Sequence, residues 1–351
     1  PLIVLANTEV VGDITWVYTT NNGKASICSG SGRDASNVVS GAITIPSMLG
    51  GCPVTSISDY AFSYCGDLSS VTIPDTVTHN GITYRVTGIG MYALVNCLNL
   101  TSVSFSNSIL SIGDNAFAGC KNLSYIAFGD SITSIGNAAF SNCAALTSFI
   151  IPNSVTNIGC QTFANCSGLT DMIIPDNVIS VGSGLFFNCS GLTSISIGNG
   201  LKKIEYHMFF GCTGLTSVTI PDSITTIGIM AFENCSNLQA VYLGEQLDSI
   251  YFYAFKGCQN LQAIYCYSPT PPYVVDFDSF DNYNAHIYVP CDSKTDYSYD
   301  AIWGLFRYIH CIGEETAIES IPSDFPHQRT CKIFRDNKAI ILRDGEEYSI
   351  L

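Results

Sequence analysis

The chain of 351 residues carries a formal net charge of −15 at pH 7 and only 14 Lys and Arg side chains. This balance argues against a nucleic-acid partner, because no basic stripe is available to follow a phosphate backbone. Hydrophobic residues make up 47% of the chain and charged residues 12%, which argues against disorder and favours a β-rich protein with small, neutral exposed residues. No run of about 18 apolar residues occurs, so no membrane span is expected. The chain begins at Pro1 and not at methionine, which is consistent with removal of a targeting segment.

Residues 1–40 lack a repeat but contain a hairpin signal. The alternating stretches Ile14–Thr20 and Lys24–Cys28 flank the sequence Asn21-Asn22-Gly23, which is typical of a tight β-hairpin. A solenoid needs its terminal apolar face covered. We therefore expect residues 1–40 to form an N-terminal capping segment.

Eight cysteines recur in the series i, i+23, i+46 and onward without one irregular step. They are Cys97, Cys120, Cys143, Cys166, Cys189, Cys212, Cys235 and Cys258. A fixed period of this length predicts a solenoid, in which one short unit stacks on copies of itself. Cys65 begins the same pattern, but its interval to Cys97 is longer than the period, so that unit carries an insertion. The insertion contains Asn80-Gly81, which predicts a second hairpin.

Each unit of the repeat predicts two extended pieces and a turn. In one unit Val218 and Ile220 are separated by a single residue, as strand residues that face the same side are. Residues 224–227 read as a second extended piece, and residues 228–235 suit one or two helical turns. The sequence therefore predicts an α/β repeat solenoid of mostly β content over residues 41–268. Parallel β-strands are expected on one face and short helical or 3-10 turns on the other.

The residue before each of the eight cysteines is always Asn or Gly. These two residue types tolerate the positive φ that left-handed caps require, so we expect the αL conformation there in every coil. Tyr64, which precedes Cys65, breaks this rule. We expect the first coil to close differently.

The units resemble the leucine-rich repeats of the BspA-like bacterial surface proteins, whose pattern is Ile-Gly-x-x-Ala-Phe-x-x-Cys-x-x-Leu-x-x-Ile-x-Ile-Pro. Residues 111–128 and 226–243 match this pattern almost position by position, and the resemblance covers residues 41–268. It implies a leucine-rich-repeat superhelix. Departures from the pattern, which we expect to be packing variants, are Glu205 and Tyr251 for the repeat glycine, and Thr162, Leu185 and Met208 for the repeat alanine.

After Cys258 the period decays. We expect residues 269–312 to form a C-terminal cap, with a last strand at Ala285–Pro290 and a short amphipathic helix at Asp300–Phe306. Residues 313–351 read as a linker followed by a short β tail of two strands.

The eight periodic cysteines are expected to form a structural ladder of buried, reduced thiols, because each stands at one fixed place in its coil and can act as a small hydrophobe. No CxxC motif or Cys/His pair has metal-ligand spacing, so we expect neither a metal nor another cofactor. The sequence leaves open whether Cys291 and Cys311, which lie outside the repeats, are disulfide-bonded.

The sequence gives no sign of catalytic chemistry. The five histidines are scattered, and no HExxH, GxSxG or phosphate-binding glycine loop occurs, so no nucleophile with an adjacent base can be named. We therefore expect no catalytic residue and no enzymatic activity.

The outward positions of the predicted strands form two columns along the rod, and most of them hold small polar residues. The exceptions are our candidate ligand-binding residues: Tyr125, Ile150 and Ile173 in mid-rod, and Tyr242 and Tyr265 near the C-terminal end. Protein and glycan contacts use exposed apolar clusters of this kind on rigid faces. Two alternatives stay open: strands favour such residues in any case, or the two tyrosines lie beneath the C-terminal cap.

The resemblance implies an extracellular protein, secreted or on the bacterial cell surface, that adheres to host or neighbouring-cell macromolecules. The expected partners are host extracellular-matrix or cell-surface proteins, with glycans as a second class. One alternative is a structural spacer or a self-assembling surface module. Another is the accessory region of a glycan-processing surface protein. The sequence does not identify the ligand.

Overall fold

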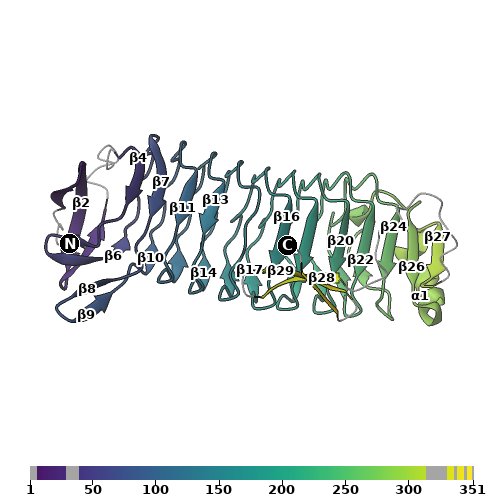
Figure 1. Cartoon of the computed structure of the whole chain (residues 1–351). Helices are drawn as coiled ribbons and strands as arrows, with labels where there is room; N and C mark the ends of the chain where they lie inside the picture. Colours follow the sequence, from purple (N-terminus) through teal and green to yellow (C-terminus); the bar gives the residue numbers. More distant parts are fainter. Residues whose placement is uncertain (1–5, 29–38, 314–329, 336–337, 344–345, 350–351) are drawn as a thin grey trace.

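The computed structural model describes residues 6–28, 39–313, 330–335, 338–343 and 346–349, the last three ranges by their backbone alone. The chain forms a β-solenoid of about 12 turns, which Figure 1 shows as an elongated rod with strands stacked along its axis. Parallel strands dominate and helices are few, so the predicted repeat-solenoid fold is confirmed. The predicted linker falls largely on residues 314–329, which lie outside the described residues.

One strand per coil builds a face that we call the strand face. Residues one period apart lie side by side in parallel register, as Val218 does with Val241 and Val241 with Ile264. These side chains enter the core, whereas the residues between them face outward. The strands are β4 (Gly41–Thr44), β7 (Leu68–Thr72), β11 (Ser102–Ser104), β13 (Tyr125–Ala127), β16 (Asp171–Ile174), β18 (Ser194–Ile197), β20 (Ser217–Ile220), β22 (Ala240–Leu243), β24 (Ala263–Cys266), β26 (His286–Val289) and β27 (Tyr308–Cys311).

The strand face is interrupted between β13 and β16, where a single bridge joins Ser148 to Asp171. The inward side chain of this coil is Phe149, whose ring centroid lies 4.9 Å from that of Phe128 and 4.6 Å from that of Phe163. The neighbouring strands carry smaller side chains at this position. Strand pairing also lapses between β18 and β20, where the inward residues are Ile195 and Val218, so the bulk of Phe149 is not a general cause of these breaks.

A second ladder of short strands confirms the second extended piece of each unit. Most of these strands have two residues and place one Ile or Val in the core; Ile227 and Ile250, for example, are fully buried. The strands are β6 (Cys52–Ile57), β10 (Gly88–Ile89), β12 (Ser111–Ile112), β14 (Ser134–Ile135), β15 (Asn157–Ile158), β17 (Ser180–Val181), β19 (Lys203–Ile204), β21 (Thr226–Ile227), β23 (Ser249–Ile250) and β25 (Tyr273–Val274).

The remaining side of each coil, which we call the turn face, contains hydrogen-bonded turns where the sequence predicted helical turns. Within residues 228–235 the Cys235 N–H donates to the Phe232 carbonyl at 3.2 Å, in the manner of a 3-10 turn, but the Phe232 N–H donates to the next coil at 2.8 Å. Met230 and Asn234 have φ of 56° and 62°. These left-handed residues turn alternate N–H groups toward the neighbouring coil, so the turns do not join into a helix.

The predicted αL conformation before each ladder cysteine is confirmed; Asn142, for example, has φ 62°. The expectation for the first coil was wrong, because Tyr64 also has φ 60° and closes that coil in the same way. Glycine follows asparagine at three coils of this column, but Asn165 follows Asn142 and Asn188 follows Asn165, so both residue types fit there. A Cβ atom on Gly119 would overlap the amide oxygen of Asn96 in the preceding coil.

A row of phenylalanine rings, one per coil, runs through the interior. From Phe117 to Phe280, consecutive rings are stacked with centroids 5.0–5.9 Å apart. A buried tryptophan lies toward each end of the rod. Trp16 meets Phe62 edge-on at 6.2 Å, and Trp303 lies 5.7 Å from Phe280.

Both predicted hairpins are confirmed. At the N-terminal end, β2 (Ile14–Asn21) and β3 (Lys24–Ile27) are antiparallel, and β1 (Asn7–Val11) adds a third strand. In the insertion, β8 (Val77–His79) pairs with β9 (Ile82–Tyr84). A short strand, β5 (Met48–Leu49), pairs with β6.

The C-terminal end differs from the prediction in three places. Strand β26 was expected to be the last, but β27 continues the sheet. The helix was expected at Asp300–Phe306, but it lies earlier, as α1 (Lys294–Tyr299). It ends at Asp300, whose carboxylate accepts the Ile302 and Trp303 N–H groups at 2.9 Å and begins a separate short turn. The tail has three antiparallel strands and not two. The remaining elements are η1 (Phe277–Ser279), η2 (Cys291–Ser293), η3 (Trp303–Leu305), β28 (Thr330–Arg335), β29 (Lys338–Arg343) and β30 (Glu346–Ser349).

Candidate interaction surface

The ladder cysteines lie in the interior, and none of the eight is more than 1% exposed or disulfide-bonded. Each thiol donates to a backbone carbonyl of the preceding coil. Cys166 Sγ lies 3.1 Å from the carbonyl oxygen of Phe140, which also accepts the N–H of Cys143. Burial raises the pKa of the Cys166 thiol to about 12. From the sequence we treated these residues as small hydrophobes and missed the hydrogen bond. The repeat pattern shows that a cysteine recurs, but it does not show which carbonyl its thiol meets.

The two unassigned cysteines near the C-terminal cap are separate thiols in this structure. Cys291 is exposed and Cys311 is buried, and no disulfide joins these two described residues.

The strand face exposes two of the mid-rod candidates. Tyr125 is 61% exposed and Ile150 is 60% exposed, whereas Ile173 is half-buried in β16. The bridge between Ser148 and Asp171 aligns their coils, so Ile150 and Ile173 occupy equivalent outward positions. Tyr125 and Ile150 thus stand on adjacent coils of one face.

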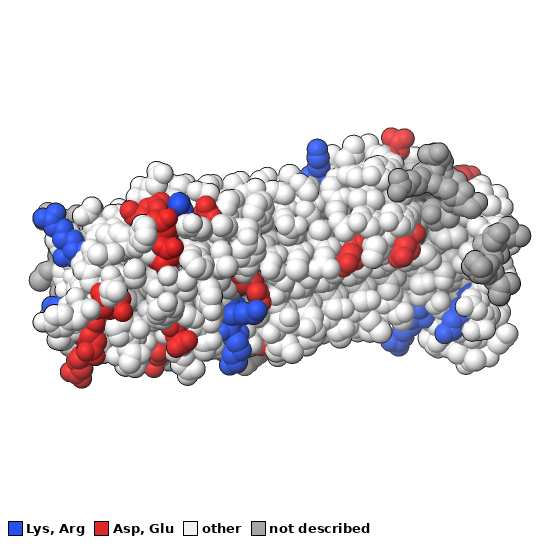
Figure 2. All heavy atoms as spheres, turned by 180° about the vertical axis from the view of Figure 1, so that it is seen from behind, with Lys and Arg blue, Asp and Glu red and all other residues white. Residues whose placement is uncertain are grey.

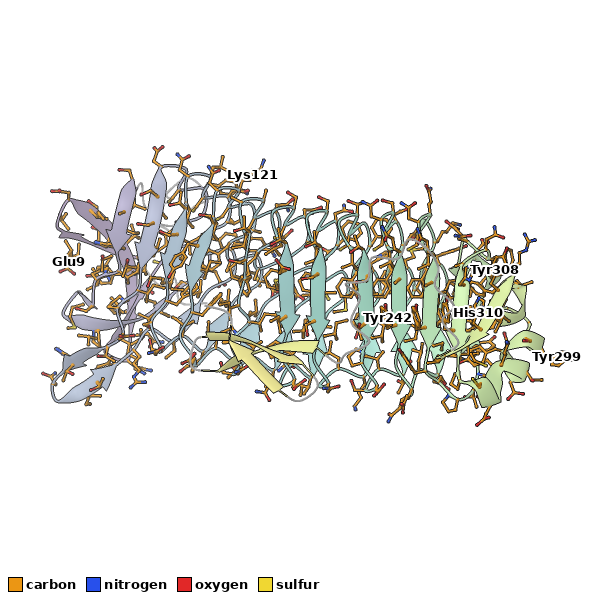
Figure 3. All side chains as sticks on the ribbon, turned by 45° about the vertical axis from the view of Figure 1, so that its right-hand side comes forward. Glu9, Lys121, Tyr242, Tyr299, Tyr308 and His310 are labelled. Atoms are coloured by element: carbon orange, nitrogen blue, oxygen red, sulfur yellow. The ribbon has the colours of Figure 1, made fainter. Side chains whose placement is uncertain are left out.

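The C-terminal candidates form part of a stack of rings. Tyr242 lies 4.7 Å from Tyr265, Tyr265 lies 4.6 Å from Tyr288, and Tyr288 lies 5.0 Å from His310. Figure 3 shows Tyr242 on the strand face and His310 farther toward the C-terminal end. Tyr242 is half-buried, but Tyr265 and Tyr288 are 9% and 3% exposed, so little of these two rings is available to a partner.

Sequence reasoning missed Tyr288, although its signal was present. Tyr288 stands one repeat period after Tyr265 and pairs with it in the strand register. Extending the outward column of Tyr242 and Tyr265 by one more period would have found it.

The middle of the rod is uncharged. Residues 131–170 contain no Asp, Glu, Lys, Arg or His. Figure 2 shows this on the rear face as an uncharged zone around the middle, with charged side chains gathered to either side of it. Ile150 projects from this zone on the strand face. A contact there would depend on shape, apolar area and neutral hydrogen bonds.

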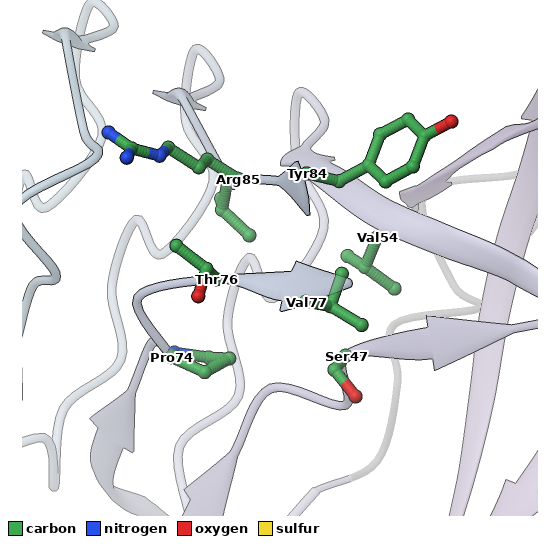
Figure 4. A pocket seen from close by; sticks show the side chains of 8 residues that line it. Ser47, Val54, Pro74, Thr76, Val77, Tyr84 and Arg85 are labelled. Atoms are coloured by element: carbon green, nitrogen blue, oxygen red, sulfur yellow. The ribbon is translucent and has the colours of Figure 1, made fainter. Parts of the chain in front are cut away.

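A small hollow with a cavity volume of about 10 Å³ lies at the base of the β8–β9 hairpin (Figure 4). Its walls come from Ser47, Val54, Pro74, Thr76, Val77, Tyr84, Arg85 and Val86. Figure 4 shows the Tyr84 and Arg85 side chains pointing in different directions. Since ligand pockets measure about 300–1,000 Å³ and need convergent polar groups, this hollow does not suit a small-molecule ligand.

The described residues offer no arrangement of three or more His, Cys, Asp or Glu side chains that could hold a metal ion. The two histidines His286 and His310 meet at 2.9 Å between Nδ1 and Nε2, and their rings stack at 5.0 Å. Among the residues that the structure describes, no helix has the length and apolar character that a membrane-crossing segment requires.

A family model described as "BspA type Leucine rich repeat region (6 copies)" matches residues 41–83, 87–212 and 180–285, which is more than half of the chain. No curated protein matches the sequence. A solved leucine-rich-repeat protein from Bacteroides ovatus ATCC 8483 is 19% identical over 86% of this chain and 76% of its own, with a TM-score of 0.56. The pneumococcal vaccine antigen PcpA is 17% identical over 89% of this chain and 100% of its own, with a TM-score of 0.52. At these identities the likeness to the two structures shows the fold.

The repeat pattern, the parallel solenoid and the family match agree with one another. Proteins with these repeats are in general non-enzymatic and occur as surface or secreted proteins of bacteria. The chain belongs to the family of BspA-type leucine-rich-repeat proteins.

Proposed function

We propose that this protein is a non-enzymatic adhesin, secreted or on the bacterial surface, that binds host or neighbouring-cell macromolecules with its strand face. The partner class that we propose is extracellular-matrix or cell-surface protein, with glycans as a second class. The observation that carries this proposal is the exposure of Tyr125 and Ile150, 61% and 60%, on adjacent coils of a rigid face.

Neither side chain is needed for folding. The inward residues of the same coils already fill the core; Ile126 packs against it and Phe149 is 6% exposed. Outward apolar side chains on a solenoid gain little from folding, but on a rigid face they supply contact area at low entropic cost. Aromatic and aliphatic anchors of this kind dominate the energy of protein interfaces.

The uncharged surroundings favour a neutral contact. Ile150 lies within the segment 131–170, which holds no charged residue. A partner that docks on Ile150 meets few charged groups on this side, the exposed Asp171 of the next coil among them, so little charge has to be desolvated, and such desolvation is costly at polar interfaces. We therefore expect binding through this face to change little between low and high salt.

The test is a binding screen of the full chain on an array of purified matrix proteins and glycans, followed by affinity measurements on the positive spots. Tyr125→Ala with Ile150→Ser should weaken binding by about 2 kcal/mol or more, which is about 30-fold. The melting temperature should stay nearly unchanged, because both side chains are exposed.

Ile179→Ser is a matched control. Ile179 is 65% exposed and stands beside the second ladder, next to β17 (Ser180–Val181), so the same apolar group is removed from a different side. Loss of binding by this control, or retention of full affinity by the double variant, would place the contact elsewhere.

A further inference from the structure

The C-terminal half of the turn face carries a group of aromatic side chains that we call the aromatic turn patch. It consists of Phe187, Tyr206, His207, Phe210, Phe252 and Tyr253. The Phe187 and Phe210 rings are stacked at 4.8 Å, His207 lies 5.3 Å from Phe210, and Tyr206 lies 3.8 Å from His207.

The rings of the patch fall on three of four successive coils, and Met230 stands in the coil between the second and the last. His207 Nε2 lies 2.9 Å from the sulfur of Met230 in the next coil, and the Met230 N–H donates to the Phe252 carbonyl of the coil after that. Three steps of about 4.8 Å give a length of about 14 Å, which matches about ten residues of an α-helix. Tyr206 and Phe252 are 40% and 38% exposed, so the surface is open to a partner.

Folding does not require these residues. His207 and Tyr253 occupy αL positions, with φ of 55° and 60°, a conformation that large side chains disfavour. Equivalent αL positions in the preceding coils hold Ala138 and Gln161. The coil therefore closes equally well with small or polar residues there, and the aromatic choice adds exposed apolar area and no core contact.

The C-terminal rim of the patch is acidic. Lys256 lies over the Tyr253 ring at 4.5 Å and 3.8 Å from the Asp278 carboxylate. Asp276 caps η1, the short helix that contains Asp278, and its carboxylate accepts the Asp278 N–H. The Asp281 carboxylate accepts the N–H of Gly257 beside Lys256. The ammonium of Lys256 is paired with Asp278, and Asp276 and Asp281 place two more carboxylates in the same segment. On Glu233, one coil earlier, the buried Oε2 atom has no hydrogen-bond partner among the described residues.

We propose that the aromatic turn patch and its acidic rim bind a cationic amphipathic segment of a partner protein, whose apolar side covers the rings and whose Lys or Arg side chains reach the carboxylates. The negative charge of the rim favours a partner of positive charge, and the rings provide most of the apolar area that the contact buries. This surface lies on a different side of the coil from the strand face, so the two can be tested separately.

The probe is a 14-residue amphipathic helical peptide of Leu and Lys, labelled for fluorescence anisotropy, with its Leu–Glu counterpart as the charge control. The full chain should bind the Leu–Lys peptide and not the Leu–Glu peptide, with an affinity that falls as salt is raised. Tyr206→Ser with Phe252→Ser should weaken binding at least tenfold. Asp276→Asn with Asp278→Asn should weaken it about threefold to tenfold and flatten the salt dependence.

Ile150→Ser, on the strand face, is the matched control and should leave peptide binding unchanged. Phe277→Ser, on the 61% exposed Phe277 beside the rim, replaces the double variant if that variant does not fold, and should weaken binding at least threefold. Equal binding of both peptides would overturn the proposal, as would equal binding by the double variant. Tighter binding of the chain to anionic phosphatidylglycerol vesicles than to the Leu–Lys peptide would also overturn it, in favour of a membrane surface.

Discussion

The turn faces of residues 113–166 and residues 205–258 share a backbone and differ in their exposed side chains. Both regions turn through αL twice per coil, and both place a ladder cysteine and a stacked phenylalanine inside. On the outside, the first region carries small and polar residues such as Asn137 and Ala138, whereas the second carries rings such as Phe252 and Tyr253. The repeat thus constrains the interior of every coil and leaves the exposed turn positions free to differ.

The energy of the turn does not explain this difference. A residue other than Gly or Asn in the αL conformation costs about 1–2 kcal/mol, and both regions include such residues, for example Ala138 and Met230. Since the cost is common to both, the aromatic residues of the second region need another cause. A binding role is the cause that we propose for the aromatic turn patch.

The largest expected effect concerns the shared interior and appears at alkaline pH. Burial raises the pKa of Cys143 in the first region and of Cys235 in the second well above the ordinary value of 9.0. A thiol whose pKa is higher in the folded state stabilises fully below pH 9 and loses that contribution as the pH rises above 9. The loss is about 1.4 kcal/mol per thiol at pH 10, and several thiols act together. Urea unfolding followed by circular dichroism at pH 7, 8.5 and 10 measures it.

The control for this prediction removes one thiol from each region. Cys143→Ala and Cys235→Ala should each reduce the fall in stability between pH 8.5 and 10 by a similar amount. A fall that neither substitution changes would mean that other groups, such as tyrosines, cause the alkaline loss.

The next largest effect tests whether the two interiors are equivalent. Phe140 and Phe232 are both fully buried, and each lies between two stacked neighbours, at 5.3 and 5.9 Å and at 5.0 and 5.2 Å. Phe140→Ala and Phe232→Ala should each lower the free energy of unfolding by about 3–5 kcal/mol, as large cavities in cores do. Chemical denaturation of the two variants compares them directly. A difference larger than the spread of about 2 kcal/mol that such substitutions show would mean that the interior also differs between the regions.

The sequence predicted the interior well because each inward position recurs in every coil. The constant period identified the cysteine ladder, and the Asn or Gly before each cysteine identified a left-handed cap that the structure confirms at Asn142 and Asn165. The second αL position escaped prediction, because residues as different as Gln161, His207 and Tyr253 occupy it. When only the backbone conformation of a position is constrained, its residue type can vary from coil to coil, and the sequence then does not reveal the conformation.

The candidate sites were harder to predict, because outward exposure depends on neighbouring coils. Tyr125 and Tyr265 are both outward tyrosines of the strand face, in neighbouring columns, yet Tyr125 is 61% exposed and Tyr265 is 9% exposed. Tyr265 lies between the rings of Tyr242 and Tyr288, whereas Tyr125 has no ring contact with another described residue. The aromatic turn patch was missed because the prediction took outward columns only from the strands, although residues one period apart on the turn face, such as Phe187 and Phe210, also lie side by side.

A smaller effect concerns the thiol donor of the ladder. Because the thiol of Cys166 already donates to the Phe140 carbonyl at 3.1 Å, a serine hydroxyl at this position has an acceptor. Cys166→Ser should therefore cost only about 1 kcal/mol, near the value of one altered hydrogen bond. Cys166→Val removes the donor and adds bulk, and should cost about 1–3 kcal/mol. Thermal unfolding of the two variants distinguishes them; a serine variant less stable than the valine variant would show that the thiol acts as a hydrophobe alone.

The smallest expected effect is a gain in stability at a turn of the first region. Ala138 is half-buried with φ 50°, and its neighbour Ala139 is fully buried in the core. Ala138→Gly should raise the free energy of unfolding by about 0.5–1 kcal/mol, because glycine adopts a positive φ without steric cost. Ala139→Gly is the matched control and should lower it by about 1 kcal/mol, since it removes a buried methyl group and adds chain freedom to the unfolded state. Chemical denaturation can measure changes of this size in the free energy of unfolding, and the two variants should change it in opposite directions. If both variants lose stability, the αL turn is not under strain at Ala138, and the backbone cost that we assign equally to both turn faces would have to be revised.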